Sequence, residues 1–403
     1  MTSWVEVPDG SPFPVTNLPY GVFSTAGHGR RVGVALGEGI VDLAPLAAAD
    51  ALEIERELGS PTLNQFLAMG RPAWSAVRAW LTDLLGTESR RDLVRRHLVP
   101  ARDATLHLPF EVADYVDFYS SQHHAENVGR LFRPDGEPLT PNWKHLPIGY
   151  HGRAGTVVVS GTDVVRPSGQ RKGPRDEAPA FGPSNRLDIE AEVGFVVGVP
   201  SRHGAPVDVS DFAEHVFGVC LLNDWSARDI QAWEYVPLGP FLGKSFATSV
   251  SPWVVPLEAL EAARVDGPVQ DPPVLPYLRR LEPWGLDLGL EVACNGTVVS
   301  RPPFAGMYWT PDQQLAHLTV NGASLRTGDL FASGTVSGAE KSERGSFLEL
   351  SWNGTEPVTL EDGSTRTFLE DGDEVEISAW APGTDGARIG LGTVTGRILP
   401  AVP

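Results

Sequence analysis

The stretch that decides the fold is Ile189-Glu190-Ala191-Glu192-Val193-Gly194-Phe195-Val196-Val197-Gly198-Val199. Its apolar, β-branched second half predicts a buried strand. Side chains two residues apart on a strand share a face, so Glu190 and Glu192 are expected side by side on a face otherwise built from Val and Phe. Two neighbouring carboxylates repel each other, which indicates a positive charge beside them. The open alternative is that both glutamates stand in solvent at a strand end.

Two further carboxylates lie in similar surroundings. Asp224 follows the apolar run Val216–Leu222, a second predicted strand, and Asp117 lies among the aromatic residues of 114–119. Carboxylates without cysteine or histidine at zinc spacing suit a hard cation, Ca²⁺ or Mg²⁺. The sequence therefore predicts a site for a hard metal ion at Asp117, Glu190, Glu192 and Asp224, although spacing alone does not show that the four converge.

Histidines are concentrated close to Asp117 in the sequence. The four are His123, His124, His145 and His151. This density favours a general base among them. Zinc binding is the alternative, but no HExxH pattern supports it.

The rest of the chain after residue 115 predicts mainly strands. Leu290–Val299 is typical of a hairpin with an Asn-Gly turn. Phe347–Trp352 and Glu374–Ile377 also resemble strands, whereas 167–186 is expected to be a long polar loop, a kind of segment that often carries function. We expect this part, residues 116–403, to be the catalytic domain.

The first part of the chain, residues 1–115, predicts a separate small domain. Short strands are expected at Val32–Leu36 and Gly39–Leu43, followed by helices over 61–99 that end before Pro100. The basic run 90–96 fits the solvated face of such a helix better than a binding patch.

Composition narrows the possible partners and the compartment. Hydrophobic residues are 41%, as in folded proteins, and the net charge of -19 argues against nucleic-acid binding. Cys220 and Cys294 are expected to be buried free thiols, which fits a reducing cytoplasm. We expect no membrane association and no signal peptide, because no apolar run approaches the ~18 residues of a membrane span and residues 1–10 lack a basic segment followed by an apolar core.

Several longer motifs then resemble the fumarylacetoacetate hydrolase family. They are Asp117-Phe118-Tyr119-Ser120-Ser121, Leu146-Pro147-Ile148-Gly149-Tyr150-His151-Gly152-Arg153, Asn223-Asp224-Trp225-Ser226-Ala227-Arg228-Asp229-Ile230-Gln231, Trp233-Glu234-Tyr235-Val236-Pro237-Leu238-Gly239-Pro240-Phe241-Leu242-Gly243-Lys244-Ser245 and Ala332-Ser333-Gly334-Thr335. The resemblance implies an α+β, mainly β fold: a small N-terminal SH3-like barrel, then a large mixed β-roll, assembled as a homodimer. It also implies hydrolysis of the carbon–carbon bond of 4-fumarylacetoacetate to fumarate and acetoacetate, the last step of tyrosine and phenylalanine breakdown.

The resemblance also implies a role for each matching residue. Ca²⁺ and/or Mg²⁺ would be held by Asp117, Glu190, Glu192 and Asp224, with a second cation near Asp224, Lys244 and Thr248. His124 would be the general base that activates water, Glu349 its orienting partner, and Arg228, Gln231 and Lys244 the groups that face the oxyanion, while the cation stabilises the enolate leaving group. The diketo-acid substrate would contact Tyr119, Arg133, Tyr150, Gln231, Tyr235 and Thr335.

The sequence departs from the family pattern at two positions, and two other functions stay open. His123 and Ala247 stand where glutamine and glycine are expected. The first alternative is a relative that acts on another diketo acid as a hydrolase, decarboxylase or hydratase. The second is a non-catalytic binding protein on the same fold, which is expected to have lost His124, Glu349 or Lys244.

Overall fold

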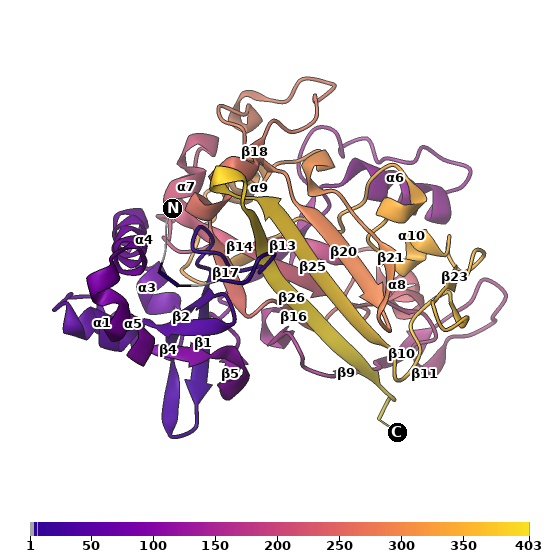
Figure 1. Cartoon of the computed structure of the whole chain (residues 1–403). Helices are drawn as coiled ribbons and strands as arrows, with labels where there is room; N and C mark the ends of the chain where they lie inside the picture. Colours follow the sequence, from indigo (N-terminus) through magenta and orange to yellow (C-terminus); the bar gives the residue numbers. More distant parts are fainter. Residues whose placement is uncertain (1–3, 6, 403) are drawn as a thin grey trace.

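A computed structural model describes residues 4, 5 and 7–402 as a strand-rich mixed α/β protein (Figure 1). Residues 1–3, 6 and 403 lie outside the described residues. The prediction that residues 1–10 are not a signal peptide therefore falls partly outside them. No described helix has the length and apolar character that a bilayer crossing requires.

The largest sheet has thirteen strands. They are β1 (Tyr20–Thr25), β2 (His28–Leu36), β3 (Gly39–Asp42), β4 (Leu98–Pro100), β5 (Ala104–His107), β6 (Tyr115–Phe118), β7 (Gly149–His151), β8 (Val157–Val159), β13 (Ala191–Val197), β14 (Val216–Asp224), β16 (Thr248–Val250), β17 (Trp253–Pro256) and β22 (Leu330–Ala332). The main path through the sheet runs β4-β3-β2-β1-β17-β14-β13-β22-β6-β7. The strand predicted at 189–199 lies near the middle of the path as β13, but it is shorter than predicted: it covers Ala191–Val197, so Glu190 comes just before the strand and Glu192 within it.

A second sheet of five strands packs across the first (Figure 1). Its strands are β9 (Val164–Val165), β20 (Gly289–Cys294), β21 (Thr297–Ser300), β25 (Glu374–Pro382) and β26 (Arg388–Leu399). The predicted hairpin is confirmed, since Asn295 and Gly296 join β20 to β21 with φ of 49° and 77°. Two-stranded pairs are formed by β10 (Ser168–Arg171) with β11 (Ala180–Pro183), β12 (Leu187–Asp188) with β15 (Ser226–Ala227), β18 (Arg264–Val265) with β19 (Gly285–Leu286), and β23 (Val358–Thr359) with β24 (Thr365–Arg366).

The helices are short apart from α4. The α-helices are α1 (Leu43–Ala49), α2 (Glu55–Leu58), α3 (Asn64–Leu67), α4 (Arg71–Gly86), α5 (Arg91–Arg96), α6 (Gln122–Phe132), α7 (Phe212–His215), α8 (Arg228–Glu234), α9 (Pro311–Thr319) and α10 (Phe347–Leu350). Single 3₁₀ turns and short 3₁₀ stretches are η1 (Glu88–Arg90), η2 (Ala101–Asp103), η3 (Ala154–Thr156), η4 (Val209–Asp211), η5 (Leu257–Ala263), η6 (Pro276–Leu278), η7 (Phe304–Gly306), η8 (Lys341–Glu343) and η9 (Thr384–Gly386). The helices predicted over 61–99 are confirmed as α3, α4 and α5 up to Arg96, but the end of the range is wrong, since Leu98 and Val99 belong to the strand β4, which pairs with β3.

Both faces of the large sheet are buried around β13. Val193 and Phe195 pack into the core shared with the second sheet, whereas Val196 packs into the core shared with the N-terminal helices. A strand buried on both faces needs apolar residues at nearly every position, which explains the continuous apolar run in the sequence. Cys220 and Cys294 are buried and free, as predicted.

Two predicted elements are corrected. Phe347–Trp352 does not form a strand; its first part is α10, because Ser346 caps that helix by accepting a hydrogen bond from the Glu349 amide. The expected long loop at 167–186 contains the hairpin β10–β11, in which the polar strand Ser168–Arg171 pairs with Ala180–Pro183.

The N-terminal strands continue the large sheet. β1 pairs with β2 on one side and with both β5 and β17 on the other. In the described part of the chain β4 pairs with β3 alone, so no closed barrel is formed there. The predicted division after residue 115 falls inside β6 and stays a prediction.

Candidate functional site

A cavity of about 360 Å³ opens where β6, β7, α6 and α8 meet. Eleven residues predicted to be functional line it: Asp117, Tyr119, His124, Arg133, Tyr150, Glu190, Arg228, Gln231, Tyr235, Lys244 and Thr335. Glu192, Asp224, Thr248 and Glu349 are buried and are not among its lining residues. His123 also does not line the cavity, although it neighbours His124 on α6.

Strand pairing brings the distant segments together. Asp117 on β6 is the partner of Ala332 on β22 and of Tyr150 on β7. Gly334 follows β22 with φ of 76°, and a Cβ there would lie 2.1 Å from the Phe118 carbonyl oxygen. Only glycine fits this close, left-handed turn, which carries the chain past β6 to Thr335.

The four predicted carboxylates form one buried cluster. Asp117, Glu190, Glu192 and Asp224 each place a carboxylate oxygen within 4.8 Å of the others. The alternative that the glutamates stand in solvent is wrong, because Glu190 is 6% exposed and Glu192 0%. Among the residues that the structure describes, no group of side chains close enough to bind one metal ion contains a histidine. The alternative that the histidines bind zinc is therefore not supported.

The oxygens of this cluster fit a missing cation. Both Glu192 oxygens and Asp117 Oδ1 are buried and accept no hydrogen bond from a described residue. Buried carboxylate oxygens without a donor are costly unless a cation coordinates them. Burial, together with Asp117 and Asp224, holds the pKa of Glu192 well above its ordinary value. Burial also raises the pKa of Asp117 to about 6, against the opposing charge of Arg153.

Glu190 differs from Glu192 because two cations hold it. Its Oε1 accepts a hydrogen bond from Arg228 Nη1 at 2.7 Å and its Oε2 one from Lys244 Nζ at 2.5 Å. Burial alone would raise the pKa of Glu190, but Lys244 and Arg228 bring it far below the ordinary value. Glu190 is thus ionised, and it fixes both cations at the cavity wall.

Both cations keep hydrogen-bonding capacity. Arg228 also donates Nε to Asp188 at 2.8 Å, yet its Nη2 is buried without a partner in the described chain. Lys244 Nζ donates to Asp224 Oδ2 at 2.7 Å as well as to Glu190, which leaves one of its three protons. Gln231, one turn along α8, lies 3.2 Å from Arg228 Nη1 through its Oε1.

His124 and Glu349 form a buried pair. The distance from His124 Nδ1 to Glu349 Oε2 is 2.7 Å, and Asn127 and Ser346 donate further hydrogen bonds to the same carboxylate. Burial opposes ionisation of Glu349, but His124 and these donors keep its pKa below the ordinary value. The carboxylate therefore orients the imidazole, whose other nitrogen is left for chemistry.

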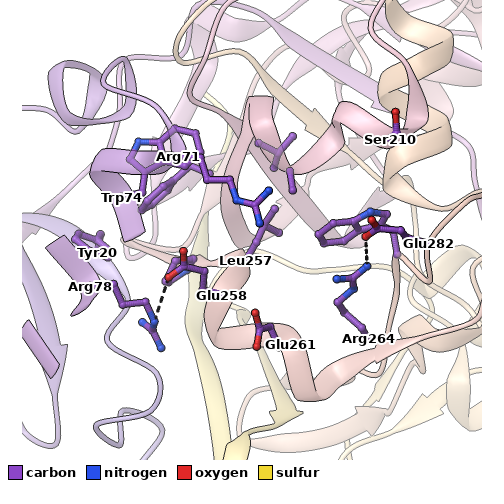
Figure 2. A pocket seen from close by; sticks show the side chains of 15 residues that line it. Tyr20, Arg71, Trp74, Arg78, Ser210, Leu257, Glu258, Glu261, Arg264 and Glu282 are labelled. Atoms are coloured by element: carbon purple, nitrogen blue, oxygen red, sulfur yellow. Dashed lines mark hydrogen bonds and ion pairs between the residues drawn. The ribbon is translucent and has the colours of Figure 1, made fainter. Parts of the chain in front are cut away.

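A second cavity lies between α4 and η5 (Figure 2). Its arginines already have acidic partners: Arg78 faces Glu258 at 3.8 Å and Arg264 binds Glu282 at 2.7 Å. With about 120 Å³ it is also much smaller than the first cavity. It lies at the junction between the N-terminal helix α4 and the rest of the protein, and none of the predicted site residues lines it.

Comparison with protein families gives two matches that together span most of the chain. The fumarylacetoacetate hydrolase C-terminal model matches residues 114–399, and the fumarylacetoacetase N-terminal model matches residues 16–109. The chain belongs to the fumarylacetoacetate hydrolase family.

Individual members of this family are similar over their full length. The chain is 50% identical to fumarylacetoacetase of Homo sapiens, covering 99% of both chains, and 51% identical to that of Caenorhabditis elegans, covering 100% of both. Among solved structures, a fumarylacetoacetate hydrolase of Exiguobacterium antarcticum has a TM-score of 0.54 at 16% identity, covering 95% of this chain and 99% of that one. Maleylpyruvate hydrolase of Sphingobium has a TM-score of 0.53 at 14% identity, covering 95% and 100%. These two structures share the fold.

The family site contains two charged residues that were not predicted to be functional. Arg153 donates to both Asp117 and Asp224, and Asp188 binds Arg228 from behind. Arg153 closes one of the family motifs, but nothing in that motif indicates that its side chain reaches back to two acids. Asp188 directly precedes the decisive strand, where a strand-end aspartate has many ordinary explanations.

Proposed function

We propose that the chain hydrolyses the carbon–carbon bond of 4-fumarylacetoacetate, giving fumarate and acetoacetate, in the last step of tyrosine and phenylalanine breakdown. One observation carries the proposal: a single cavity is lined by a carboxylate-oriented histidine, two buried cations and the edge of a four-carboxylate cluster. Its relatives of about 50% identity are fumarylacetoacetases over their full length.

His124 is the proposed general base. The ionised Glu349 accepts a hydrogen bond from Nδ1, so the free lone pair of the imidazole is on Nε2. Nε2 takes a proton from water as that water attacks the carbonyl carbon next to the bond that breaks. The resulting oxyanion is bound by the free Arg228 Nη2, by Lys244 and by the Gln231 amide, all of which line the cavity.

Asp117, Glu190, Glu192 and Asp224 would hold a divalent cation, Ca²⁺ or Mg²⁺. When bound, it supplies positive charge that stabilises the enolate form of the departing acetoacetate. A second cation near Asp224, Lys244 and Thr248 is also proposed; Thr248 Oγ1 donates to Asp224 Oδ1 at 2.9 Å. Lys244 would contribute its carbonyl oxygen there, because an ammonium group has no lone pair.

The remaining cavity residues are proposed to bind the substrate. Arg133 suits the terminal carboxylate through paired hydrogen bonds. Thr335 Oγ1 is buried and has no partner among the described residues, so it is available to a substrate oxygen. Tyr119, Tyr150 and Tyr235 also line the cavity, and the Tyr119 ring stands edge-on to His124 at 5.3 Å.

Quaternary structure and compartment are part of the proposal. We propose a homodimer in the cytoplasm, with an SH3-like N-terminal unit and a β-roll catalytic unit. Exposed apolar side chains support the dimer: Val236, Leu238 and Phe241 are 66%, 95% and 68% exposed within one segment beside the cavity. Apolar residues gathered in this way are typical of an interface.

The test is the loss of the ultraviolet absorbance of fumarylacetoacetate on incubation with protein supplied with Ca²⁺ and Mg²⁺. We expect the absorbance to fall while fumarate and acetoacetate appear in equal amounts. No loss with metal-replete, folded protein would contradict the proposal. Turnover of another diketo acid in its place, such as an acylpyruvate, would favour the related-hydrolase alternative.

A further inference from the structure

Arg153 holds two of the four clustered carboxylates at once. Its Nη2 donates to Asp117 Oδ2 at 2.8 Å and to Asp224 Oδ2 at 2.6 Å. The side chain is only 4% exposed, so these ion pairs are shielded from water and from salt.

The position of Arg153 is tightly fixed. Its guanidinium lies between two aromatic rings, 4.7 Å from the centre of Tyr115 and 4.8 Å from that of Tyr150. Its backbone has φ of 59°, a left-handed conformation that non-glycine residues rarely adopt. Such backbone strain persists where the surrounding structure demands one particular side-chain placement.

Arg153 also determines which oxygens stay free. It occupies Oδ2 of Asp117 and leaves Oδ1 without a partner among the described residues. Asp224 has both oxygens occupied, by Thr248 on Oδ1 and by Lys244 and Arg153 on Oδ2. The unpartnered carboxylate oxygens of the cluster are therefore Asp117 Oδ1 and the two of Glu192.

The charges around the cluster can be counted. Its four carboxylates meet two cations of their own, Lys244 and Arg153, while Arg228 is balanced by Asp188. Two negative charges remain, which one divalent cation would neutralise.

We propose that Arg153 is a positioning residue that sets this balance of charge and thereby makes the cluster select a divalent over a trivalent cation. This inference rests on the proposed cation site.

The test compares Ca²⁺ with Tb³⁺, which has nearly the same radius and one more charge. Both are titrated by calorimetry into protein stripped with EDTA, so that no activity measurement is involved. In R153M and R153Q one positive charge is lost, and the ratio of Tb³⁺ to Ca²⁺ affinity should rise roughly tenfold or more over that of the wild type. R153K keeps the charge and should keep the wild-type ratio.

R166M is the matched control. Arg166 is also a buried arginine in an ion pair, with Asp371, but it is not bonded to any member of the cluster. An unchanged ratio in R153M and R153Q, both folded by circular dichroism, would overturn the inference, and so would an equal rise in R166M. E192Q tests the cation site itself: it should bind Ca²⁺ more weakly than the wild type, because it removes one carboxylate of the cluster. If the wild type bound neither ion, or if E192Q bound Ca²⁺ as the wild type does, the proposed cation site would fail.

Discussion

At the scale of single residues, the neighbours His123 and His124 are the clearest test of the site. Only His124 lines the cavity and binds Glu349. H124A should lower turnover of fumarylacetoacetate by about a hundredfold or more, the usual contribution of a general base. Ca²⁺ affinity should stay nearly unchanged, because His124 is not part of the carboxylate cluster.

H123A serves as the matched control for that substitution. It removes a half-buried imidazole one position away on the same helix, outside the cavity. It should keep turnover close to that of the wild type in the same absorbance assay. An inactive H123A beside an active H124A would show that the base has been assigned to the wrong histidine.

Residue chemistry was predictable to different degrees within the site. Glu190 and Glu192 were predictable because strand periodicity alone puts them side by side beneath an apolar run. Arg153 was not, because the turn that aims it at Asp117 and Asp224 depends on contacts between segments far apart in the chain. Spacing in sequence describes one strand or helix, whereas a site is assembled by several.

At the scale of elements, α10 shows why the local sequence pattern predicted a strand where the protein forms a helix. Its sequence alternates in a way that resembles a strand, but its first amides are satisfied from elsewhere: Asp188 accepts hydrogen bonds from the amides of Phe347 and Leu348. Asp188 belongs to β12, so part of what starts this helix, beside its own N-cap Ser346, lies far away in sequence. The hairpin β10–β11 was missed for the converse reason, since its composition is that of a loop.

Removing the Asp188 carboxylate should therefore destabilise two elements together. D188A removes one of the two acidic partners of the buried Arg228, leaving Glu190, and strips α10 of a carboxylate that accepts from its first amides. We expect the free energy of unfolding to fall by about 3–5 kcal/mol. Urea denaturation measures the loss. D208A removes an exposed aspartate that caps η4 and should cost only about 0.5–2 kcal/mol. Equal effects of the two substitutions would contradict the coupling.

At the scale of the whole molecule, stability should depend on the cation and on pH together. Burial, with a smaller contribution from Asp224 and against the opposing charge of Arg153, raises the pKa of Asp117 to about 6 from an ordinary value of 3.8, and burial also raises the pKa of Glu192. Between about pH 3.8 and pH 6 the folded, metal-free protein thus binds more protons than the unfolded chain. Its free energy of unfolding therefore falls as the pH rises through this range. EDTA should lower Tm more at about pH 7.5 than at about pH 5.

Thermal denaturation followed by circular dichroism at both pH values tests this prediction. E192Q removes one of the buried charges, so its Tm should respond less to EDTA at the higher pH. A drop of equal size at both pH values in the wild type would count against a buried, ion-dependent cluster.

The proposed dimer is tested on the exposed segment beside the cavity. L238D places a charge at a side chain that is 95% exposed, and it should shift the mass measured by sedimentation from dimer to monomer at micromolar concentration. L281D is the matched control at another exposed leucine, 66% exposed, and should leave the mass unchanged. A monomeric wild type, or an L238D protein that remains dimeric, would contradict the proposed interface.

The continuity of the large sheet has a practical consequence. Because β1 pairs with β17 and the N-terminal helices share a core with β13 and β14, the first hundred or so residues are hydrogen-bonded into the rest of the protein. Heating should give one calorimetric transition for the entire chain. A fragment that begins after residue 115 would expose the edge of β17 and a broad apolar face, so separate expression of the catalytic part should yield aggregates.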